Sequence, residues 1–352
     1  MGALTSGDGE VADVTAVPVV DLRSAPDQLR QRLRRAAHEV GFFYLTGHGV
    51  PDRLIARMFA VARRLFALPQ AEKDAVAMVR SPHFRGYTRL GGELTRGEVD
   101  WREQIDIGPE RAAIAGPGRP DYLWLQGPNQ WPAALPELPA VVAEWDAALS
   151  SVARTLLRHW AAALGSPPDV FDAAFADAPA TLIKIIRYPA RAAGSQGVGA
   201  HRDAGVLTLL LAEPGSRGLQ VRTATGEWVD VPPLAGAFIV NIGELLEIAT
   251  GGYLRATEHR VVLDESAAER ISVAYFFNPR LDARIPVLTL PPELAARAKP
   301  VEDPADPIFS VYGRNAWKSR LRAHPDVAAA HGYSAGRVGS ENSGSRGNAK
   351  GE

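Results

Sequence analysis

A histidine and an aspartate two positions apart are the residues whose types and spacing point most directly to chemistry. His201 and Asp203 lie in a glycine-rich stretch, residues 197–205, that precedes an apolar run. On an extended segment, side chains two apart project to the same face, so both could bind one metal ion. His259 stands farther along, before a second, β-branched run. Two imidazoles and one carboxylate can bind Fe(II) on one face and leave the other coordination positions open.

A second pair of polar residues, Arg270 and Ser272, opens the strand-like run that ends at Phe277. A guanidinium group can bind both oxygens of a carboxylate, and a neighbouring hydroxyl can donate a further hydrogen bond. Because the run is otherwise apolar, a buried Arg270 without a partner would be costly. The pair therefore predicts a receptor for a carboxylate.

The order of these motifs, His-X-Asp, then His, then Arg-X-Ser, resembles that of the iron(II)/2-oxoglutarate dioxygenases of the isopenicillin N synthase-like family. The resemblance covers residues 16–282. It includes further segments similar to the core and the N-terminal part of that family: 17–22, 41–50, Tyr188-Pro189, 218–221, 228–233, 241–244 and 276–279.

The resemblance implies a mainly β fold with flanking α-helices, built around a double-stranded β-helix, the jelly-roll core of cupin-like proteins. It also implies the metal: Fe(II), bound by His201, Asp203 and His259.

The resemblance further implies that 2-oxoglutarate is a cosubstrate, held by Arg270 and Ser272 with help from Tyr188, and that O2 is the oxidant. In the implied reaction, 2-oxoglutarate gives succinate and CO2 while a small molecule is hydroxylated, desaturated or cyclised. The sequence leaves these three outcomes open. It identifies the substrate only as a small molecule, and we expect a role in specialised metabolism.

Candidate residues of the substrate pocket follow from the resemblance alone: Phe84, Arg85, Tyr87, Phe277 and, as a pocket wall or lid, the segment 314–321. An arginine among aromatic side chains would suit a substrate that carries a carboxylate. Arg202 is a further candidate, but on a regular strand it would point away from its neighbours His201 and Asp203, which favours a structural role.

Three other functions fit parts of the same pattern. An iron oxidase of the same fold that does not use 2-oxoglutarate could use Arg270 and Ser272 to hold a substrate carboxylate. A zinc hydrolase could use the two histidines and the aspartate, but it has no need of the Arg-X-Ser pair. A non-catalytic binding protein would have no need of either motif. Succinate formation and dependence on Fe(II) rather than Zn(II) distinguish these functions.

The composition indicates which classes of binding partner to expect. The chain has 352 residues, a formal net charge of −1 and no cysteine. It therefore has no disulfide and no thiolate metal site, and we expect a cytoplasmic protein. Without a basic tract or an apolar run of about 20 residues, neither nucleic acid nor a membrane is an expected partner. We expect a monomer or a weak homo-oligomer.

The predicted elements form one structural domain in two parts. Residues 16–135 form an N-terminal α/β region, and residues 136–322 form a scaffold helix, the jelly-roll core and a late helix around Trp317. Residues 81–110 are predicted to be irregular, and residues 333–352 to be a disordered tail. Helices are predicted at 24–40, 51–68 and 139–164, and strands at 17–22, 42–45, 181–188, 206–212, 219–222, 228–231, 237–242, 259–263 and 271–277.

Overall fold

The computed structural model describes residues 17–116, 118–190, 196–263, 268–299 and 306–333. Apart from Tyr333, the predicted disordered tail lies outside the described residues. Within the described ranges, no helix is long and apolar enough to cross a membrane.

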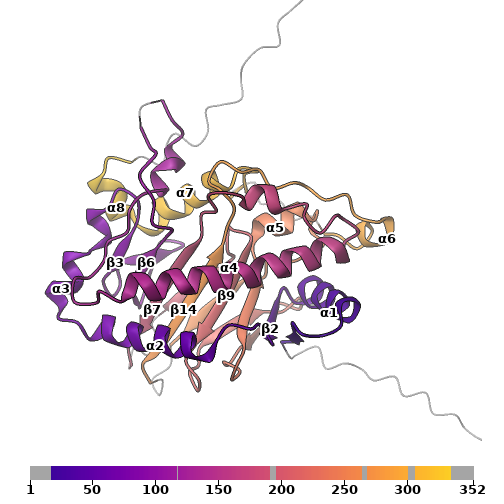
Figure 1. Ribbon diagram of the computed structural model, residues 1–352, viewed down its shortest axis with the longest axis horizontal. Helices are drawn as coiled ribbons and strands as arrows, with labels where there is room; N and C mark the ends of the chain where they lie inside the picture. The colour runs from indigo at the N-terminus through magenta and orange to yellow at the C-terminus, as the bar shows by residue number, and fades with distance from the viewer. Residues whose placement is uncertain (1–16, 117, 191–195, 264–267, 300–305, 334–352) are drawn as a thin grey trace, which may run out of the picture.

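Two β-sheets form the centre of the fold (Figure 1). The larger sheet has eight strands, in the order β1 (Val19–Asp21), β2 (Phe42–Thr46), β12 (Phe238–Ile242), β9 (Leu207–Ala212), β14 (Arg270–Phe277), β7 (Leu182–Tyr188), β6 (Glu103–Ile107) and β3 (Gly86–Thr88). The smaller sheet has the order β11 (Trp228–Asp230), β10 (Leu219–Arg222), β13 (His259–Val262) and β8 (Gln196–His201). A separate hairpin joins β4 (Glu93–Thr95) to β5 (Glu98–Asp100).

The two sheets pack against each other through apolar side chains. Ile186 and Ala274 of the larger sheet share one buried cluster with Val198, Leu219 and Val261 of the smaller sheet. Two packed, largely antiparallel sheets of this kind make a jelly roll. The predicted mainly β fold with a double-stranded β-helix core is therefore confirmed.

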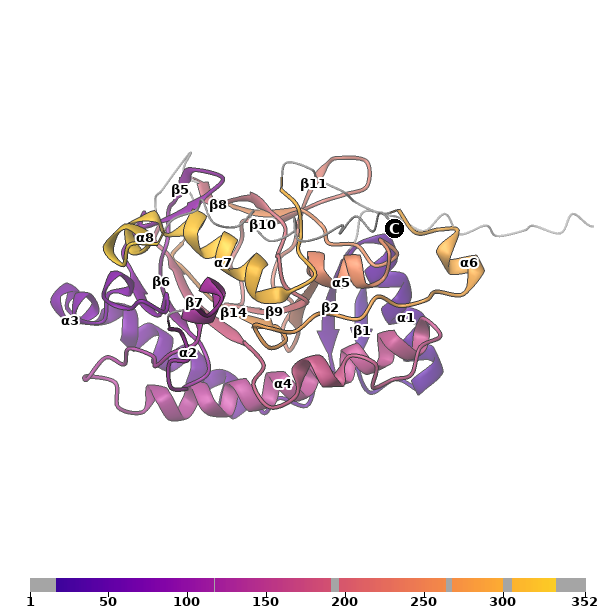
Figure 2. The ribbon, with the colours of Figure 1, turned by 90° about the horizontal axis from the view of Figure 1, so that it is seen from above.

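Three helices cover the outer face of the larger sheet: α1 (Pro26–Glu39), α2 (Asp52–Ala67) and α4 (Leu138–Ala163) (Figure 2). The long helix α4 buries a stripe of large side chains that recur every three or four residues, among them Trp145, Leu149 and Trp160. This periodicity is what an amphipathic helix needs to lie on a sheet. The scaffold helix predicted at 139–164 is present with nearly the same ends.

Strand β14 separates the helical core from the space between the sheets, because its side chains alternate between the two faces. Tyr275 faces the helices, where its hydroxyl lies 2.9 Å from Asp146 Oδ1 and 2.7 Å from Ser150 Oγ on α4. Arg270 and Ser272 lie on the opposite face. The alternation thus places the predicted carboxylate receptor on the inner face of the jelly roll.

The remaining α-helices are shorter: α3 (Gln70–Ala75), α5 (Glu244–Ala249), α6 (Pro292–Ala295), α7 (Tyr312–Ala323) and α8 (Pro325–Ala330). In Figure 2, α5 and α7 lie on the face of the larger sheet opposite α4. Helix α7 contains the predicted late helix around Trp317.

The prediction of an irregular segment at residues 81–110 is wrong. The segment contains β3, β4, β5 and β6, and β6 pairs with β7 in the larger sheet. The sequence of β6, Glu-Gln-Ile-Asp-Ile, conceals a buried strand because its acidic side chains are compensated by distant cations. A pattern based on apolar alternation cannot detect such pairing.

Candidate active site

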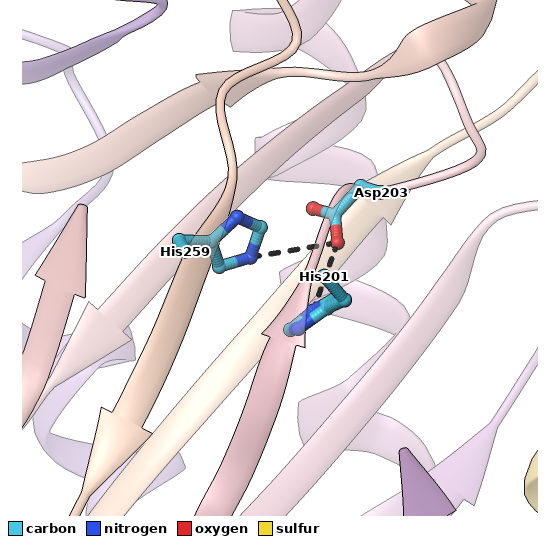
Figure 3. A group of neighbouring side chains, drawn as sticks. All are labelled: His201, Asp203 and His259. Atoms are coloured by element: carbon cyan, nitrogen blue, oxygen red, sulfur yellow. Dashed lines mark ion pairs between the residues drawn. The ribbon is translucent and has the colours of Figure 1, made fainter. Parts of the chain in front are cut away.

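The pairing of β8 with β13 brings the two candidate histidine ligands together. His201 ends β8, His259 begins β13, and the two residues are directly opposite each other in the antiparallel register. Their ring centroids are 4.3 Å apart. Asp203 follows β8, and its Oδ1 lies 3.5 Å from His201 Nε2 and 3.6 Å from His259 Nε2 (Figure 3). Ligand atoms of all three residues lie within 4.8 Å of one another.

Backbone carbonyls orient both imidazoles. The Nδ1 of His201 lies 2.8 Å from the carbonyl oxygen of Gly199, and the Nδ1 of His259 lies 3.1 Å from that of Thr257. When each Nδ1–H donates to its carbonyl, each Nε2 presents a lone pair to the shared point. Burial, aided by the neighbouring His201, lowers the pKa of His259 to about 4, so its imidazole is neutral at pH 7. This donor set fits Fe(II).

The carboxylate of Asp203 is held by two polar side chains of the larger sheet. Thr208 on β9 and Asn241 on β12 are paired in register, and both donate hydrogen bonds to Asp203 Oδ2, from Asn241 Nδ2 at 2.8 Å. Oδ1 is thereby left to face the histidines. Although burial alone would raise the pKa of Asp203, the imidazoles of His259 and His201 hold it below its usual range.

The sequence interpretation did not identify Thr208, and it included Asn241 only in the segment 241–244 that resembles the family core, without a role at the metal site. The available signal was a single polar residue inside each of two apolar strands, Leu-Thr-Leu-Leu-Leu-Ala and Phe-Ile-Val-Asn-Ile. A buried polar group needs a hydrogen-bond partner, and here the partner is a metal-ligand candidate.

Replacement of Thr208 with valine is expected to lower Fe(II) affinity about 10- to 100-fold, because the side chains that orient a metal ligand have effects of this size. An anaerobic Fe(II) titration measures the change. The matched control is Thr155→Val, whose hydroxyl bonds the carbonyl of Ser151 on the exposed side of α4. Equal affinity in the two variants would contradict the assignment.

Close backbone packing fixes the loop that carries Asp203. The Glu244 amide donates to the Asp203 carbonyl at 2.8 Å, and the Gly243 amide donates to that of Val206 at 3.0 Å. A Cβ at Gly243 would lie 2.2 Å from the carbonyl oxygen of Gly205. Glycine is therefore required here by the close approach of the two chain segments.

Arg270, Tyr188 and Ser272 meet on the inner face of the larger sheet. Arg270 and Tyr188 are direct partners of β14 and β7, and the guanidinium carbon lies 5.0 Å from the Tyr188 ring centre. The three side chains are 4%, 3% and 1% exposed. Among the described residues, Nε and Nη1 of Arg270 have no hydrogen-bond partner. A buried guanidinium with free donors fits the carboxylate of a ligand.

The metal triad and this guanidinium line the same cavity, of about 1480 Å³. Single-ligand pockets commonly occupy about 300–1,000 Å³, so the space suits a cosubstrate and a second small molecule together. Its apolar lining includes Ile186, Val198, Leu210 and Phe276.

Three of the substrate-binding predictions in the N-terminal region are wrong. Phe84, Arg85 and Tyr87 do not line this cavity. Phe84 is fully buried and packs against Trp317, Arg85 donates to the carbonyl of Leu125 at 2.8 Å, and the hydroxyl of Tyr87 bonds Glu103. Each has an internal partner that the sequence does not reveal.

The prediction for Phe277 is wrong by one position. Side chains alternate along β14, so Phe277 points to the helical side, where its ring stacks on Phe175 at 4.5 Å. Phe276 lines the cavity instead. Arg202 also lines it and is exposed, so its role in substrate binding stays a prediction.

Phe277→Ala is expected to destabilise the protein by about 3–5 kcal/mol, because a large, fully buried side chain leaves a cavity. Phe276→Ala, at a partly exposed position, is expected to cost less and to alter substrate binding. Urea denaturation of both variants measures the difference. An unchanged stability of Phe277→Ala would contradict the placement of its ring.

The cavity also has charged walls, of which the sequence interpretation named only Arg320, as part of the candidate segment 314–321. Arg102, Lys184 and Arg320 line it together with Glu93, and at the start of α5 it is lined by Glu244 and Glu247. These residues come from five different elements or loops, and nothing in their spacing connects them.

Comparison with known proteins places this site in a family. Residues 17–134 match the family model described as the N-terminal region of a non-haem dioxygenase in morphine synthesis, and residues 180–279 match that of the 2OG-Fe(II) oxygenase superfamily. A relative named 2-oxoglutarate-dependent dioxygenase frbJ, from Dothideomycetidae sp. (strain 11243), is 33% identical over 89% of this chain and 90% of its own length. A homoarginine-6-hydroxylase of Glycine max is 33% identical over 78% of this chain and 88% of its own.

The solved structures agree. JOX2, in complex with 2OG, Fe and JA, is 26% identical, with a TM-score of 0.68 over 89% of this chain and 88% of its own. The relatives named as 2-oxoglutarate-dependent dioxygenases do not favour the alternative of an oxidase that dispenses with 2-oxoglutarate. On the strength of its sequence matches, its jelly roll and its metal triad, this chain belongs to the 2OG-Fe(II) oxygenase superfamily, in the isopenicillin N synthase-like family.

Proposed function

We propose that this Fe(II)- and 2-oxoglutarate-dependent dioxygenase hydroxylates a small amino acid that carries a second cationic group. The observation that carries the proposal is the pair of oppositely charged walls in the cavity: Lys184 and Arg320 on one, Glu244 and Glu247 on another. The relatives that are named homoarginine-6-hydroxylases support it, because homoarginine has both charges. Opposite charges at separate places would bind and orient such a molecule.

The proposal assigns the Fe(II) ligands as His201, Asp203 and His259. When bound together, iron and 2-oxoglutarate supply the oxidation, in which O2 is consumed, succinate and CO2 are released, and one oxygen atom enters the substrate.

For 2-oxoglutarate, the proposed receptor is Arg270 with Ser272 and Tyr188. The unpartnered Nε and Nη1 of Arg270 support it. Bidentate binding of the distal carboxylate would fix the cosubstrate at one end and orient its other end in the shared cavity.

The acidic wall suits a guanidinium or ammonium group. Glu247 is 6% exposed, and its Oε1 accepts a hydrogen bond from the Ala256 amide at 3.0 Å. In the described part of the chain, neither Glu247 nor Glu244 forms an ion pair. Burial raises the pKa of Glu244 to about 7, and a substrate cation would stabilise its charged form.

Turnover assays with Fe(II), 2-oxoglutarate and O2 test this function. The compounds are L-homoarginine, L-arginine and L-lysine, compared with indole-3-acetate, which has a carboxylate but no cation, and with uncharged thymine. We expect succinate formation to be stimulated by the basic amino acids, with a product that gains one oxygen atom. Stimulation by indole-3-acetate or thymine alone would refute the proposed substrate class.

The assembly and location remain proposals. We propose one structural domain, because strands from residues 16–135 complete the sheet formed by residues 136–322. We also propose a monomer or weak homo-oligomer that does not bind nucleic acid, supported by the net charge of −1, and a cytoplasmic location, supported by the lack of cysteine. Light scattering over a concentration series would test the assembly.

A further inference from the structure

Seven buried charged residues meet where β4, β6, β7 and α7 approach one another. The exposed fractions of the cations are 6% for Arg85, 7% for Arg102, 9% for Lys184 and 8% for Arg320. Those of the carboxylates are 4% for Glu93 and 0% for Asp100 and Asp106. Burial of this many charges is costly unless they are paired. An unequal number of buried cations and carboxylates would therefore point to a missing ligand.

Three of the cations have carboxylate partners. Lys184 Nζ donates to Glu93 Oε1 at 2.6 Å, and Arg102 Nη2 donates to Glu93 Oε2 at 2.9 Å and to Asp100 Oδ2 at 3.1 Å. Arg320 Nη1 donates to Asp106 Oδ2.

The fourth cation leaves the cluster one negative charge short. Arg85 donates to the carbonyl of Leu125 and, in the described part of the chain, has no carboxylate within salt-bridge distance. Four cations therefore face three carboxylates. His324 Nε2 lies 3.5 Å from Glu93 Oε1 and brings no negative charge. The adjacent Glu103 is already matched by Lys73 and Arg187.

The cluster reaches the cavity through three of its four cations. Arg102, Lys184 and Arg320 all line it, and α7 presents Arg320 from the same face as Ala316 and Ser319. Arg320 donates to Asp106 through Nη1, and among the described residues Nε of Arg102 is buried without a hydrogen-bond partner. Free donors on buried guanidinium groups are suited to an anionic ligand.

Lys184, and Arg320 through its partner Asp106, lie apart from the receptor proposed for 2-oxoglutarate. Lys184 pairs in register with Ala274, four positions along β14 from Arg270. At about 3.3 Å per residue, that spacing separates Lys184 from Arg270 by about 13 Å along the strands. One 2-oxoglutarate molecule held at Arg270 therefore leaves these cations available.

We propose that Arg320, Arg102 and Lys184 form the receptor for the carboxylate of the substrate, and that Arg320 determines the preference for a carboxylate over a neutral group. The inference rests on the proposed function in that it assumes a substrate with a carboxylate, but it does not require a basic amino acid.

Substrate binding to the anaerobic Fe(II)–2-oxoglutarate protein tests the receptor through the change in the visible absorption of the complex. The probes are two matched pairs, L-homoarginine with its carboxamide and indole-3-acetate with indole-3-acetamide. In the unmodified protein we expect one carboxylate to bind about 30-fold or more tightly than its amide. In Arg320→Gln we expect that ratio to fall towards one, while 2-oxoglutarate affinity stays unchanged.

The control variant is Arg158→Gln, which removes the exposed ion pair between Arg158 of α4 and Asp172 and should retain the full ratio. If Arg320→Gln does not fold, Arg320→Lys keeps the charge, and we expect it to retain an intermediate ratio.

The outcomes separate this inference from the proposed function. A carboxylate preference seen only with the indole pair would refute the basic amino acid but support the receptor. Equal binding of acids and amides, or no binding of either carboxylate, would overturn the receptor. A preference that survives in Arg320→Gln would show that these charges serve the fold alone.

Discussion

Replacement of His259 with alanine is expected to abolish turnover and to lower Fe(II) affinity by well over 100-fold. Loss of a group that only orients a ligand costs about 10- to 100-fold, and loss of a ligand must exceed this. His259 contributes one of three ligand atoms that lie within 4.8 Å of one another. Anaerobic Fe(II) titration gives the affinity, and succinate formation gives the turnover.

The fold should survive this change, since β13 retains its pairing with β8 and β10 through the backbone. The matched control is His331→Ala. In the unmodified protein the His331 ring bonds the carbonyl of Val79, and neither residue belongs to the triad. Normal turnover in His259→Ala, or an equal loss in His331→Ala, would refute the triad assignment. Loading the unmodified protein with Zn(II) should leave the metal site filled and turnover absent, which separates this enzyme from a zinc hydrolase.

The sequence predicted the elements whose patterns are local. Helix α4 repeats large apolar residues with helical spacing, and β14 is an apolar run opened by Arg270 and Ser272. The metal triad was also predictable, because the order His-X-Asp and then His, each before a strand-like run, is typical of a metal site with two imidazoles and one carboxylate.

Features that depend on distant partners could not be predicted. Strand β8, which carries His201, was not among the predicted strands because its sequence, Gln-Gly-Val-Gly-Ala-His, lacks apolar alternation. Strand β8 is stabilised by a residue of another strand: Asp100 of β5 accepts hydrogen bonds from the Gly199 amide at 3.2 Å and from Gln196 Nε2 at 2.9 Å. The partner lies almost a hundred positions earlier in the chain, at a distance that no local pattern spans.

The charged cavity wall shows the same limit. Lys184 interrupts an apolar strand, which alone would suggest an unfavourable buried charge. Only the fold shows that Glu93 compensates it, and that Arg320 arrives from a helix near the other end of the chain. For Phe277 the error was smaller. The strand was predicted correctly, but the neighbouring residue, Phe276, is the one that faces the cavity.

Arg270→Met is expected to raise the 2-oxoglutarate requirement by about 30-fold or more, because loss of one partner of a buried charge pair costs about 2–5 kcal/mol. The measurement is an anaerobic titration with 2-oxoglutarate, followed by the visible absorption of the iron complex. Arg158→Gln is the control for loss of an arginine. An unchanged requirement would refute the receptor.

The same substitution should stabilise the protein when no cosubstrate is present. Burial lowers the pKa of Arg270, since the charged form loses its hydration, and no carboxylate among the described residues forms an ion pair with it. Replacing buried charged groups with apolar ones of similar size is often neutral or stabilising by about 1–4 kcal/mol. We therefore expect the free energy of unfolding of Arg270→Met to equal or exceed that of the unmodified protein in urea. Saturating 2-oxoglutarate should reverse the order, because it stabilises only the protein that binds it. A destabilised variant that still responds to 2-oxoglutarate would mean that Arg270 serves the fold rather than the cosubstrate.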